Sequence, residues 1–200
     1  MKLYYLAGAC STAAMISLLE AGQKFDAVAV DRGTKRTADG NDFNQINPKG
    51  YVPALVLDNG DKLSENVAIL TYIASLDKSA TLGPAIGTAS YYHLLEWLAY
   101  LNSEVHKNFS PLFRPNLDDA ARAIFRENLI KRLGYIEQQL SAAPFLMGQN
   151  FTVADAYLYV ALSWRGHVGV DISALPQLTA FYERVRARPS VSEAYRIQGL

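Results

Sequence analysis

The chain has one cysteine, no excess of charge of either sign and no long apolar run in its 200 residues. The single cysteine, Cys10, excludes an internal disulfide, so the fold needs no oxidising compartment. Nineteen Lys and Arg balance nineteen Asp and Glu, which argues against nucleic acid or an anionic membrane as a partner. No stretch approaches the roughly 18 apolar residues of a membrane span, and residues 1–10 lack the apolar segment of a signal peptide. We therefore expect a cytoplasmic protein.

Several catalytic motifs are missing as well. His, Cys, Asp and Glu do not cluster at metal-ligand spacing, so we expect no metal. The segment GACSTAAM is not a phosphate-binding loop. Ala13 stands three residues after Cys10, where a dithiol enzyme has its second cysteine. Any reaction of this protein is therefore expected to use one thiol and no bound cofactor.

The first 80 residues alternate between strand and helix patterns. Half of the chain is hydrophobic and 19% is charged, as in a folded globular protein. Apolar runs and periodicity predict the order strand, helix, strand, loop, strand, strand, helix, over residues 2–6, 11–22, 25–30, 31–45, 54–57, 62–64 and 65–76. Asn59 and Gly60 form a hairpin signal between the last two strands. This order indicates a small α/β unit, which we assign to residues 1–78.

The rest of the chain shows only helical patterns. Residues 79–87 contain Gly and Pro and are interpreted as a linker. Apolar residues then recur every three or four positions, which predicts helices from Tyr91 to Phe109, from Leu117 to Pro144, and beginning near Phe151 and Leu175. The first must end by Pro111, and Thr152 and Asp155 are predicted to cap the third, a structural role. Residues 88–200 are therefore assigned to an all-α unit.

Cys10 stands where the first strand gives way to the first helix, for which Ser11 or Thr12 is the predicted N-cap. A helix N-terminus presents free N–H groups and a positive dipole end, and both stabilise a thiolate. We therefore predict that the pKa of Cys10 lies below that of a free thiol. The alternative is a small buried residue without reactivity, which is the usual fate of a lone cysteine.

Two further short segments precede elements of the α/β unit. Pro53 stands just before a strand, so it forms a turn, an edge or a cis bond. A cis bond would turn the backbone groups of Val52 outward, toward an extended peptide ligand. Glu65 and Asn66 open a helix whose free N–H groups suit an anion. A simple turn and ordinary helix capping explain the same residues without a ligand.

The first long helix carries a polar stripe beside its leucines, formed by Asn102, Ser103, His106 and Ser110. The stripe either lines a cleft or is the solvent face of the helix. A histidine in a cleft can accept and return a proton near pH 7, which makes His106 a candidate catalytic residue. His93 and His167 lack such neighbours and are predicted to be surface or capping residues.

Taken in order, these features resemble the glutathione S-transferase family. The cysteine at a helix start, the Val-Pro pair before a strand and the acidic-polar pair before a helix resemble its thioredoxin-like glutathione-binding domain. The segments SEVHK (103–107) and FSPLFRP (109–115) resemble the bacterial beta class, and FTVADA (151–156) resembles the capping box of the family's core helix. The resemblance covers essentially the whole chain. It implies a thioredoxin-like N-terminal domain followed by an all-helical C-terminal domain.

The resemblance implies a role for each candidate residue. Cys10 would contact the sulfur of glutathione, and His106 would orient the thiol or share its proton. The implied glutathione site contains Lys35 at the glycyl carboxylate, Val52 and Pro53 at the cysteinyl unit, Glu65 and Asn66 at the γ-glutamyl group, and also Ser103 and Lys107. The implied apolar site for the second substrate contains Phe109, Leu112, Phe113 and Trp164.

Four positions depart from the beta-class pattern. The chain has Asn66 where Ser or Gly is usual, Ala7 for a proline, Met15 for a histidine and Ala99 for an asparagine that is offered to the neighbouring subunit's glutathione. An amide still donates hydrogen bonds, so glutathione binding is expected to survive at Asn66 in altered geometry. Ala99 removes the expected contact across the subunits but leaves the fold intact.

The resemblance implies a homodimeric enzyme that conjugates the glutathione thiol to hydrophobic electrophiles, with glutathione as a co-substrate. Two alternatives remain. One is a glutathione-dependent thiol–disulfide reductase or peroxidase that uses Cys10. The other is a non-catalytic family member that binds apolar ligands or a protein partner. The presence of Cys10, Glu65 and His106 together favours an enzyme, and no residue pattern specifies the electrophile.

Overall fold

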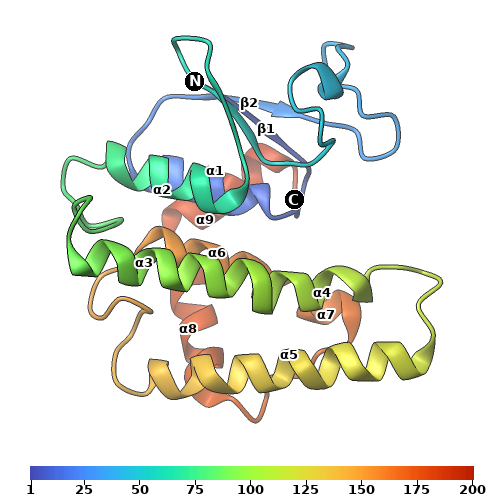
Figure 1. Ribbon diagram of the computed structural model, residues 1–200, viewed down its shortest axis with the longest axis vertical. Coiled ribbons are helices and arrows are strands. Elements are labelled where there is room, and N and C mark those ends of the chain that lie inside the picture. The colour runs from blue at the N-terminus through green and yellow to red at the C-terminus, as the bar shows by residue number, and fades with distance from the viewer.

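The structure, a computed structural model, describes residues 1–200 and shows a small α/β unit packed on a larger helical unit (Figure 1). The α/β unit contains β1 (Lys2–Tyr5), α1 (Ser11–Glu20), β2 (Asp26–Ala29), a 3-10 turn (Phe43–Gln45), β3 (Ala54–Val56), β4 (Lys62–Ser64) and α2 (Asn66–Leu76). The order and type of these elements are those predicted from the sequence. The predicted loop over 31–45 additionally holds the short 3-10 turn.

The four strands form one mixed sheet in the order β2-β1-β3-β4. β1 pairs parallel with β2 and antiparallel with β3, which pairs antiparallel with β4. Leu3 in β1 lies opposite Leu55 in β3, and both are fully buried in the core shared with α1 and α2. Tyr4 points to the other face, where its ring lies 5.7 Å from that of Phe43. Alternation along β1 therefore places one side chain after another on opposite faces.

The helical unit follows the linker. It contains α3 (Ala89–Tyr100), a π-helical segment (Leu101–His106), α4 (Lys107–Leu112), α5 (Asp119–Leu140), α6 (Val153–Ser163), α7 (Arg165–Val168), α8 (Pro176–Arg186) and α9 (Pro189–Gln198). Every residue of α6 from Val153 to Leu162 is buried, because this helix packs against α1 and α2 above it and α3 and α8 beside it. The contact between α6 and α1 joins the two units.

The predicted helix from Tyr91 to Phe109 differs from an α-helix in its middle. The chain keeps one direction from α3 to α4 (Figure 1), but Leu101–His106 widens to a π-turn. Side chains occupy carbonyl groups of this segment: Asn108 Nδ2 donates to the Glu104 carbonyl at 2.6 Å and Ser110 Oγ to the His106 carbonyl at 3.0 Å. The wider turn rotates Ser103, three residues before His106, away from the side of His106, whereas Asn102, four residues before it, stays on nearly the same side as in an α-helix.

Two helices were not predicted. α7 is a single turn, too short to show a period. α9 begins with Pro189 and follows the last helix that the sequence predicted, the one that begins near Leu175. Proline suits the first position of a helix because its missing N–H would have no partner there. Val191 and Ala194 bury the inner side of α9, which packs on α1. None of the helices is both long and apolar enough to cross a membrane.

Candidate active site

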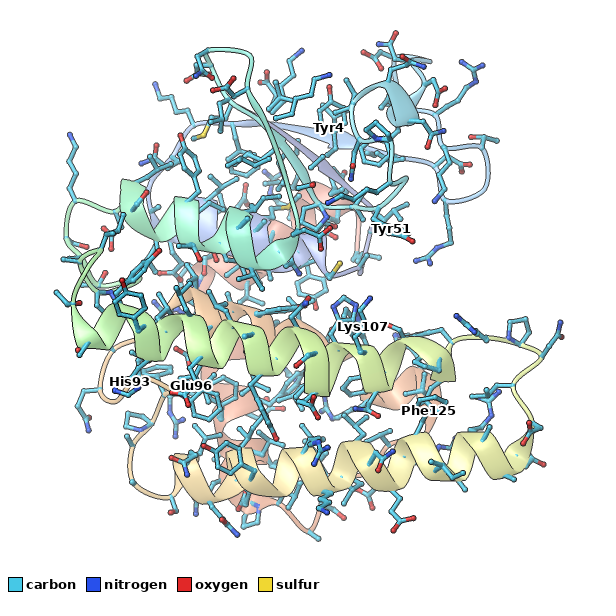
Figure 2. All side chains as sticks on the ribbon, in the orientation of Figure 1. Tyr4, Tyr51, His93, Glu96, Lys107 and Phe125 are labelled. Atoms are coloured by element: carbon cyan, nitrogen blue, oxygen red, sulfur yellow. The ribbon has the colours of Figure 1, made fainter.

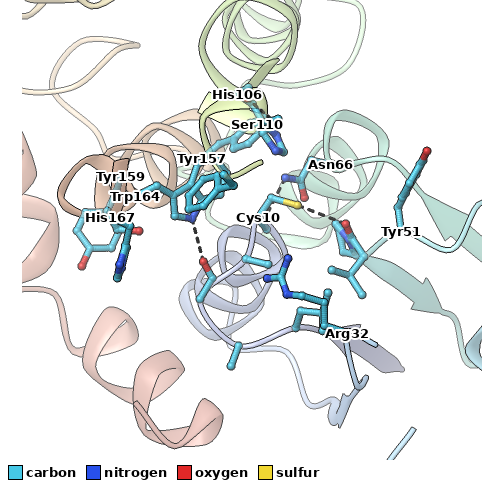
Figure 3. A pocket seen from close by; sticks show the side chains of 18 of the residues that line it. Cys10, Arg32, Tyr51, Asn66, His106, Ser110, Tyr157, Tyr159, Trp164 and His167 are labelled. Carbon is cyan, nitrogen blue, oxygen red and sulfur yellow. Dashed lines mark hydrogen bonds between the residues drawn. The ribbon is translucent and has the colours of Figure 1, made fainter. Parts of the chain in front are cut away.

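A cavity of about 1180 Å³ opens between the two units (Figure 3). Its upper side comes from the loop between β1 and α1, the loop before β3 and the start of α2. Its lower side comes from the π-helical segment, α4 and the helices from α6 to α9. Lys107 lies on the side of α4 that faces the upper unit, and Tyr51 lies across from it (Figure 2). Segments far apart in sequence therefore share one site.

Cys10 lies at the centre of this cavity, at the N-cap position of α1, and its side chain makes no capping bond. Its thiol donates to the carbonyl oxygen of Val52 at 3.3 Å. Burial raises the pKa of the Cys10 thiol to about 11, although the N–H groups of Cys10 and Ser11, and Lys107, act in the opposite direction. The prediction of an acidic thiol is therefore wrong for the ligand-free protein, because desolvation outweighs the helix start.

The N-cap prediction is also wrong. Ser11 is the first residue inside α1, and its hydroxyl accepts a hydrogen bond from the Leu6 N–H at 3.2 Å. Gly8 has φ +68°, a left-handed conformation that favours glycine. The N–H of Gly8 donates to Gln198 Oε1 at 2.9 Å, and its carbonyl accepts from Trp164 Nε1 at 2.8 Å. The loop that carries Cys10 is thus held by α9 and by the end of α6.

The structure brings the predicted glutathione-site residues of the α/β unit together at the cavity. The Val52–Pro53 peptide is cis, which is one of the three possibilities left open by the sequence. Lys35 lines the cavity, and its Nζ donates to the Gly50 carbonyl at 3.2 Å. Glu65 is the N-cap of α2, makes no capping bond and pairs with Lys49 at 2.8 Å. The predicted residues Lys35, Val52, Pro53, Glu65 and Asn66 therefore all line the cavity.

Asn66 links the starts of the two helices of the α/β unit. It is 5% exposed, and its Nδ2 donates to the backbone carbonyl of Cys10 at 3.2 Å. Its Oδ1 is buried and has no hydrogen-bond partner. A buried acceptor without a partner costs free energy unless a ligand supplies a donor. The position that departs from the family pattern is thus a functional candidate in its own right.

His106 reaches the cavity from the π-helical segment (Figure 3). Its Nδ1 lies 2.7 Å from the Tyr157 hydroxyl, and its ring lies 4.8 Å from that of Trp164. Burial, with a smaller effect from Lys107, lowers the pKa of His106 to about 4, so the imidazole is neutral near pH 7. Lys107 itself lines the cavity on the same side.

Three of the predicted residues lie elsewhere. Ser103 is exposed, outside the cavity, and donates to Glu104 at 3.4 Å, because the π-turn rotates it away from the side that holds His106. Phe109 and Leu112 are buried in the core rather than in the lining. Phe109 packs behind Trp164, with ring centroids 5.7 Å apart. Apolar residues that recur every three or four positions mark one side of a helix. The recurrence does not show whether a given residue packs in the core or lines a cleft beside it.

The other residues predicted for the second substrate do line the cavity. Trp164 is 7% exposed, and Phe113 is 50% exposed at the opening. Of the remaining histidines, His93 is exposed on α3 and contacts Glu96 at 3.2 Å, as a surface residue would. His167 is exposed as well but lies at the cavity rim, which the sequence analysis did not predict.

Sequence reasoning missed several residues of the lining, among them Arg32, Tyr157, Tyr159, Tyr182, Arg186 and Tyr195. Tyr157 is the most closely integrated, since its hydroxyl contacts His106 and donates to Asn102 Oδ1 at 3.0 Å. Its position in the wholly buried α6 was the available signal, because a buried phenol needs a hydrogen-bond partner. No group of three or more His, Cys, Asp or Glu side chains is placed to hold a metal ion.

Comparisons with known proteins agree with this arrangement. Two family profiles match, the glutathione S-transferase N-terminal domain over residues 1–75 and the C-terminal domain over residues 103–196. Glutathione S-transferase GstA of Escherichia coli O157:H7 is 42% identical over 200 residues, the full length of both chains. A sphingomonad glutathione S-transferase complexed with glutathione shares 44% identity with a TM-score of 0.96 over both full chains. A beta-class enzyme of Sphingomonas chungbukensis shares 46% identity with a TM-score of 0.95, also over both full chains. The chain therefore belongs to the glutathione S-transferase family of enzymes, as the order of its motifs predicted.

Proposed function

We propose that this protein binds glutathione in the cavity and joins its sulfur to an electrophilic carbon of a second, largely apolar substrate. The observation that carries this proposal is the meeting of Cys10, Val52, Asn66 and His106 around one opening between the two units. The upper unit, residues 1–78, would bind glutathione. The lower unit, residues 88–200, would supply His106 and the apolar wall.

The charges of the lining suit glutathione, which carries two carboxylates and one ammonium group. Four cations line the cavity, Arg32, Lys35, Lys107 and Arg186, against one carboxylate, Glu65. The chain as a whole has a formal net charge of zero, so this excess is local to the cavity. We place the γ-glutamyl group at Glu65 and Asn66, where the open Oδ1 of Asn66 can accept from its ammonium group. The glycyl carboxylate then lies toward Lys35.

The size of the cavity supports a second substrate. Pockets that hold a single small ligand have volumes of about 300–1,000 Å³, and this one measures about 1180 Å³. Trp164 and Phe113 provide an apolar surface on the helical side, beside His106. An electrophile bound there would face the glutathione sulfur. Holding two reactants in this way converts a bimolecular reaction into an effectively unimolecular one.

In this proposal Cys10 is a hydrogen-bond donor rather than a nucleophile. Its thiol already donates to the Val52 carbonyl, and a pKa of about 11 keeps it protonated near pH 7. When glutathione binds, the backbone of Val52 pairs with the tripeptide and the thiol of Cys10 turns to the glutathione sulfur. A reductase mechanism that begins with a Cys10 thiolate is disfavoured by the same raised pKa.

A glutathione-affinity measurement and a conjugation assay test the proposal together. We expect calorimetry to show binding of glutathione, and a panel of aryl halides and epoxides to give thioether products detected by mass spectrometry. Binding without any thioether would leave a non-catalytic ligand-binding protein. Release of glutathione disulfide from mixed disulfides, with no thioether, would establish the reductase alternative instead.

We further propose that the protein acts as a homodimer in the cytoplasm, where glutathione keeps thiols reduced. Sedimentation equilibrium at micromolar protein is expected to give twice the chain mass of 22.0 kDa. A mass of one chain at the same concentration would contradict the dimer. Glutathione binding and thioether formation are measured separately from the mass, so that result would leave the proposed reaction to be decided by its own assay.

A further inference from the structure

We propose that Tyr157 and Asn102 fix the tautomer of His106, so that the proton sits on Nδ1 and Nε2 offers its lone pair to the glutathione thiol. Tyr157 and Asn102 are then positioning residues, and they act through His106 rather than by touching the substrate. The proposal rests on the proposed function for its role in the reaction. The tautomer itself is a property of the ligand-free protein.

The tautomer follows from counting protons along a chain of two hydrogen bonds. The Tyr157 hydroxyl donates to Asn102 Oδ1 at 3.0 Å, and a carbonyl oxygen can only accept. The single proton of that hydroxyl is then committed. His106 Nδ1 lies 2.7 Å from the same hydroxyl oxygen, so this nitrogen must be the donor. A neutral imidazole with its proton on Nδ1 has a lone pair on Nε2.

The protonation states of both rings support this count. Burial lowers the pKa of His106 to about 4, and Lys107 acts in the same direction, so the ring carries only one proton near pH 7. Burial raises the pKa of Tyr157, and the nearby Cys10 and Glu65 raise it further, whereas Asn66 acts in the opposite direction. The phenol therefore keeps its proton, and the chain from His106 through Tyr157 to Asn102 has one direction.

The remaining nitrogen of His106 has no hydrogen-bond partner in the protein, and His106 lines the cavity. Nδ1 is the only atom of its side chain with a hydrogen-bond partner in the protein, and His106 belongs to the lining beside Cys10 and Asn66 (Figure 3). Trp164 packs at 4.8 Å from the imidazole and limits rotation of the ring. Asn102 and His106 stand four residues apart on one helical segment, so both reach Tyr157 from the same side.

This geometry assigns a proton path for the conjugation of an aryl halide. The thiol proton of glutathione passes to Nε2 of His106, which becomes an imidazolium whose Nδ1–H still donates to Tyr157. The thiolate forms a bond to the aryl carbon, and the halide leaves with the electron pair of the carbon–halogen bond. The imidazolium then releases its proton to water. A His106 with its proton on Nε2 could not accept the thiol proton there.

The tautomer can be measured directly by nitrogen NMR of the three histidines, of which His93 and His167 lie outside this hydrogen-bond chain. In the parent protein near pH 7 we expect His106 to carry its proton on Nδ1. In Asn102→Ala the Tyr157 proton loses its acceptor and is expected to turn to Nδ1 of His106, so the proton of His106 should move to Nε2. Asn102→Asp restores an acceptor oxygen and should restore the parent tautomer. A parent His106 protonated on Nε2, or an Asn102→Ala protein with the parent tautomer, would overturn the proposal.

Kinetics then test whether the tautomer matters to the reaction. We expect Asn102→Ala and Tyr157→Phe to lower kcat with saturating glutathione by about tenfold or more, while the glutathione dissociation constant changes less than twofold. Tyr100→Phe is the matched control, because it loses a comparable phenol hydrogen bond, 3.1 Å to the Arg132 carbonyl, outside the cavity. Equal losses in Tyr100→Phe, or unchanged kcat in both test variants, would contradict the positioning role. If the parent forms no thioether the proposed function fails, but the NMR result still decides the tautomer.

Discussion

The two helices that meet at the centre of the molecule, α1 and α6, begin in opposite ways. At the start of α6, Asp155 accepts hydrogen bonds from the Thr152 N–H, the Thr152 hydroxyl and the Leu146 N–H, at 2.8, 2.8 and 2.9 Å. At the start of α1, no side chain caps the helix, and the N–H groups of Cys10 and Ser11 lower the pKa of the Cys10 thiol against the larger effect of burial. One helix start is satisfied from within the chain, and the other is left open at the cavity.

This difference shows how one chain separates stability from binding. The groups at the start of α6 are buried and have all their partners, so a ligand has nothing to gain there. At the start of α1, the buried Oδ1 of Asn66 has no partner, and Asn66 and Cys10 line a cavity that a ligand can fill. Four experiments test this difference between the starts of α1 and α6.

The largest expected effect concerns the reactivity of Cys10. With a pKa of about 11, roughly one thiol in a thousand is a thiolate at pH 8, against about one in four for a free thiol of pKa 8.5. Labelling by iodoacetamide at pH 8 should therefore be more than a hundredfold slower in the native protein than in the same protein unfolded in urea. A native labelling midpoint at or below pH 8.5 would show that the open helix start overcomes burial.

The next effect concerns the satisfied helix start. Asp155→Ala removes three acceptor bonds at a site that is 0% exposed and should lower the free energy of unfolding by about 3 kcal/mol. Asp118→Ala is the control, since Asp118 is an exposed N-cap that accepts one bond from Ala121, and its loss should cost about 1 kcal/mol. Urea unfolding measures both. Equal losses would mean that burial adds nothing to the cap of α6.

Removing the thiol at the open start should affect the reaction more than the fold. Cys10→Ala removes the thiol that we propose as the donor to the glutathione sulfur, so we expect kcat to fall by about tenfold. The free energy of unfolding should change by less than about 1 kcal/mol, since the lost bond to Val52 is one hydrogen bond of a partly exposed residue. Cys10→Ser keeps a donor and should stay near the parent. Complete loss of thioether formation in both variants would instead indicate that Cys10 reacts covalently.

The smallest effect is a slope in the pH dependence of stability. Burial raises the pKa of Asp155 to about 6, above its unfolded value of 3.8, so the folded state holds this proton more tightly than the unfolded state. The stability that Asp155 contributes is then fully present below pH 3.8 and is lost as pH rises through about 6. Urea titrations of the parent between pH 4 and 7 should show this decline, and Asp155→Asn should remove it. A parent slope of the opposite sign, absent in Asp155→Asn, would contradict the raised pKa.

The parts of the fold that the sequence predicted depend on neighbouring residues. The short apolar run of β1, the periodic stripes of the long helices and the Thr152–Asp155 pair are local signals, and the structure confirms each of them. Cys10, Val52 and Asn66 could be singled out because each stands where one element gives way to the next. Such junctions between elements can be predicted from sequence because turns and helix starts favour particular residue types.

The parts that could not be predicted depend on tertiary contacts. The π-turn moved Ser103 out of the site, and no local pattern distinguishes it from an α-helix. The raised pKa of Cys10 comes from burial, which depends on how the whole chain packs around residue 10. Tyr157 belongs to a run of buried, mostly apolar residues in α6, and such a run does not indicate which side chain has its hydroxyl at a cavity.

The position of Trp164 has a practical consequence. The protein has two tryptophans, Trp97 and Trp164. Trp164 forms a wall of the cleft, whereas Trp97 packs with Tyr100 and Tyr135 on the side of α3 away from it. A Trp97→Phe protein therefore carries a single tryptophan, and its emission, excited selectively at the red edge of the absorption band, reports on the site itself. Ligand entry can then be followed optically in real time, on unlabelled protein, and separately from turnover.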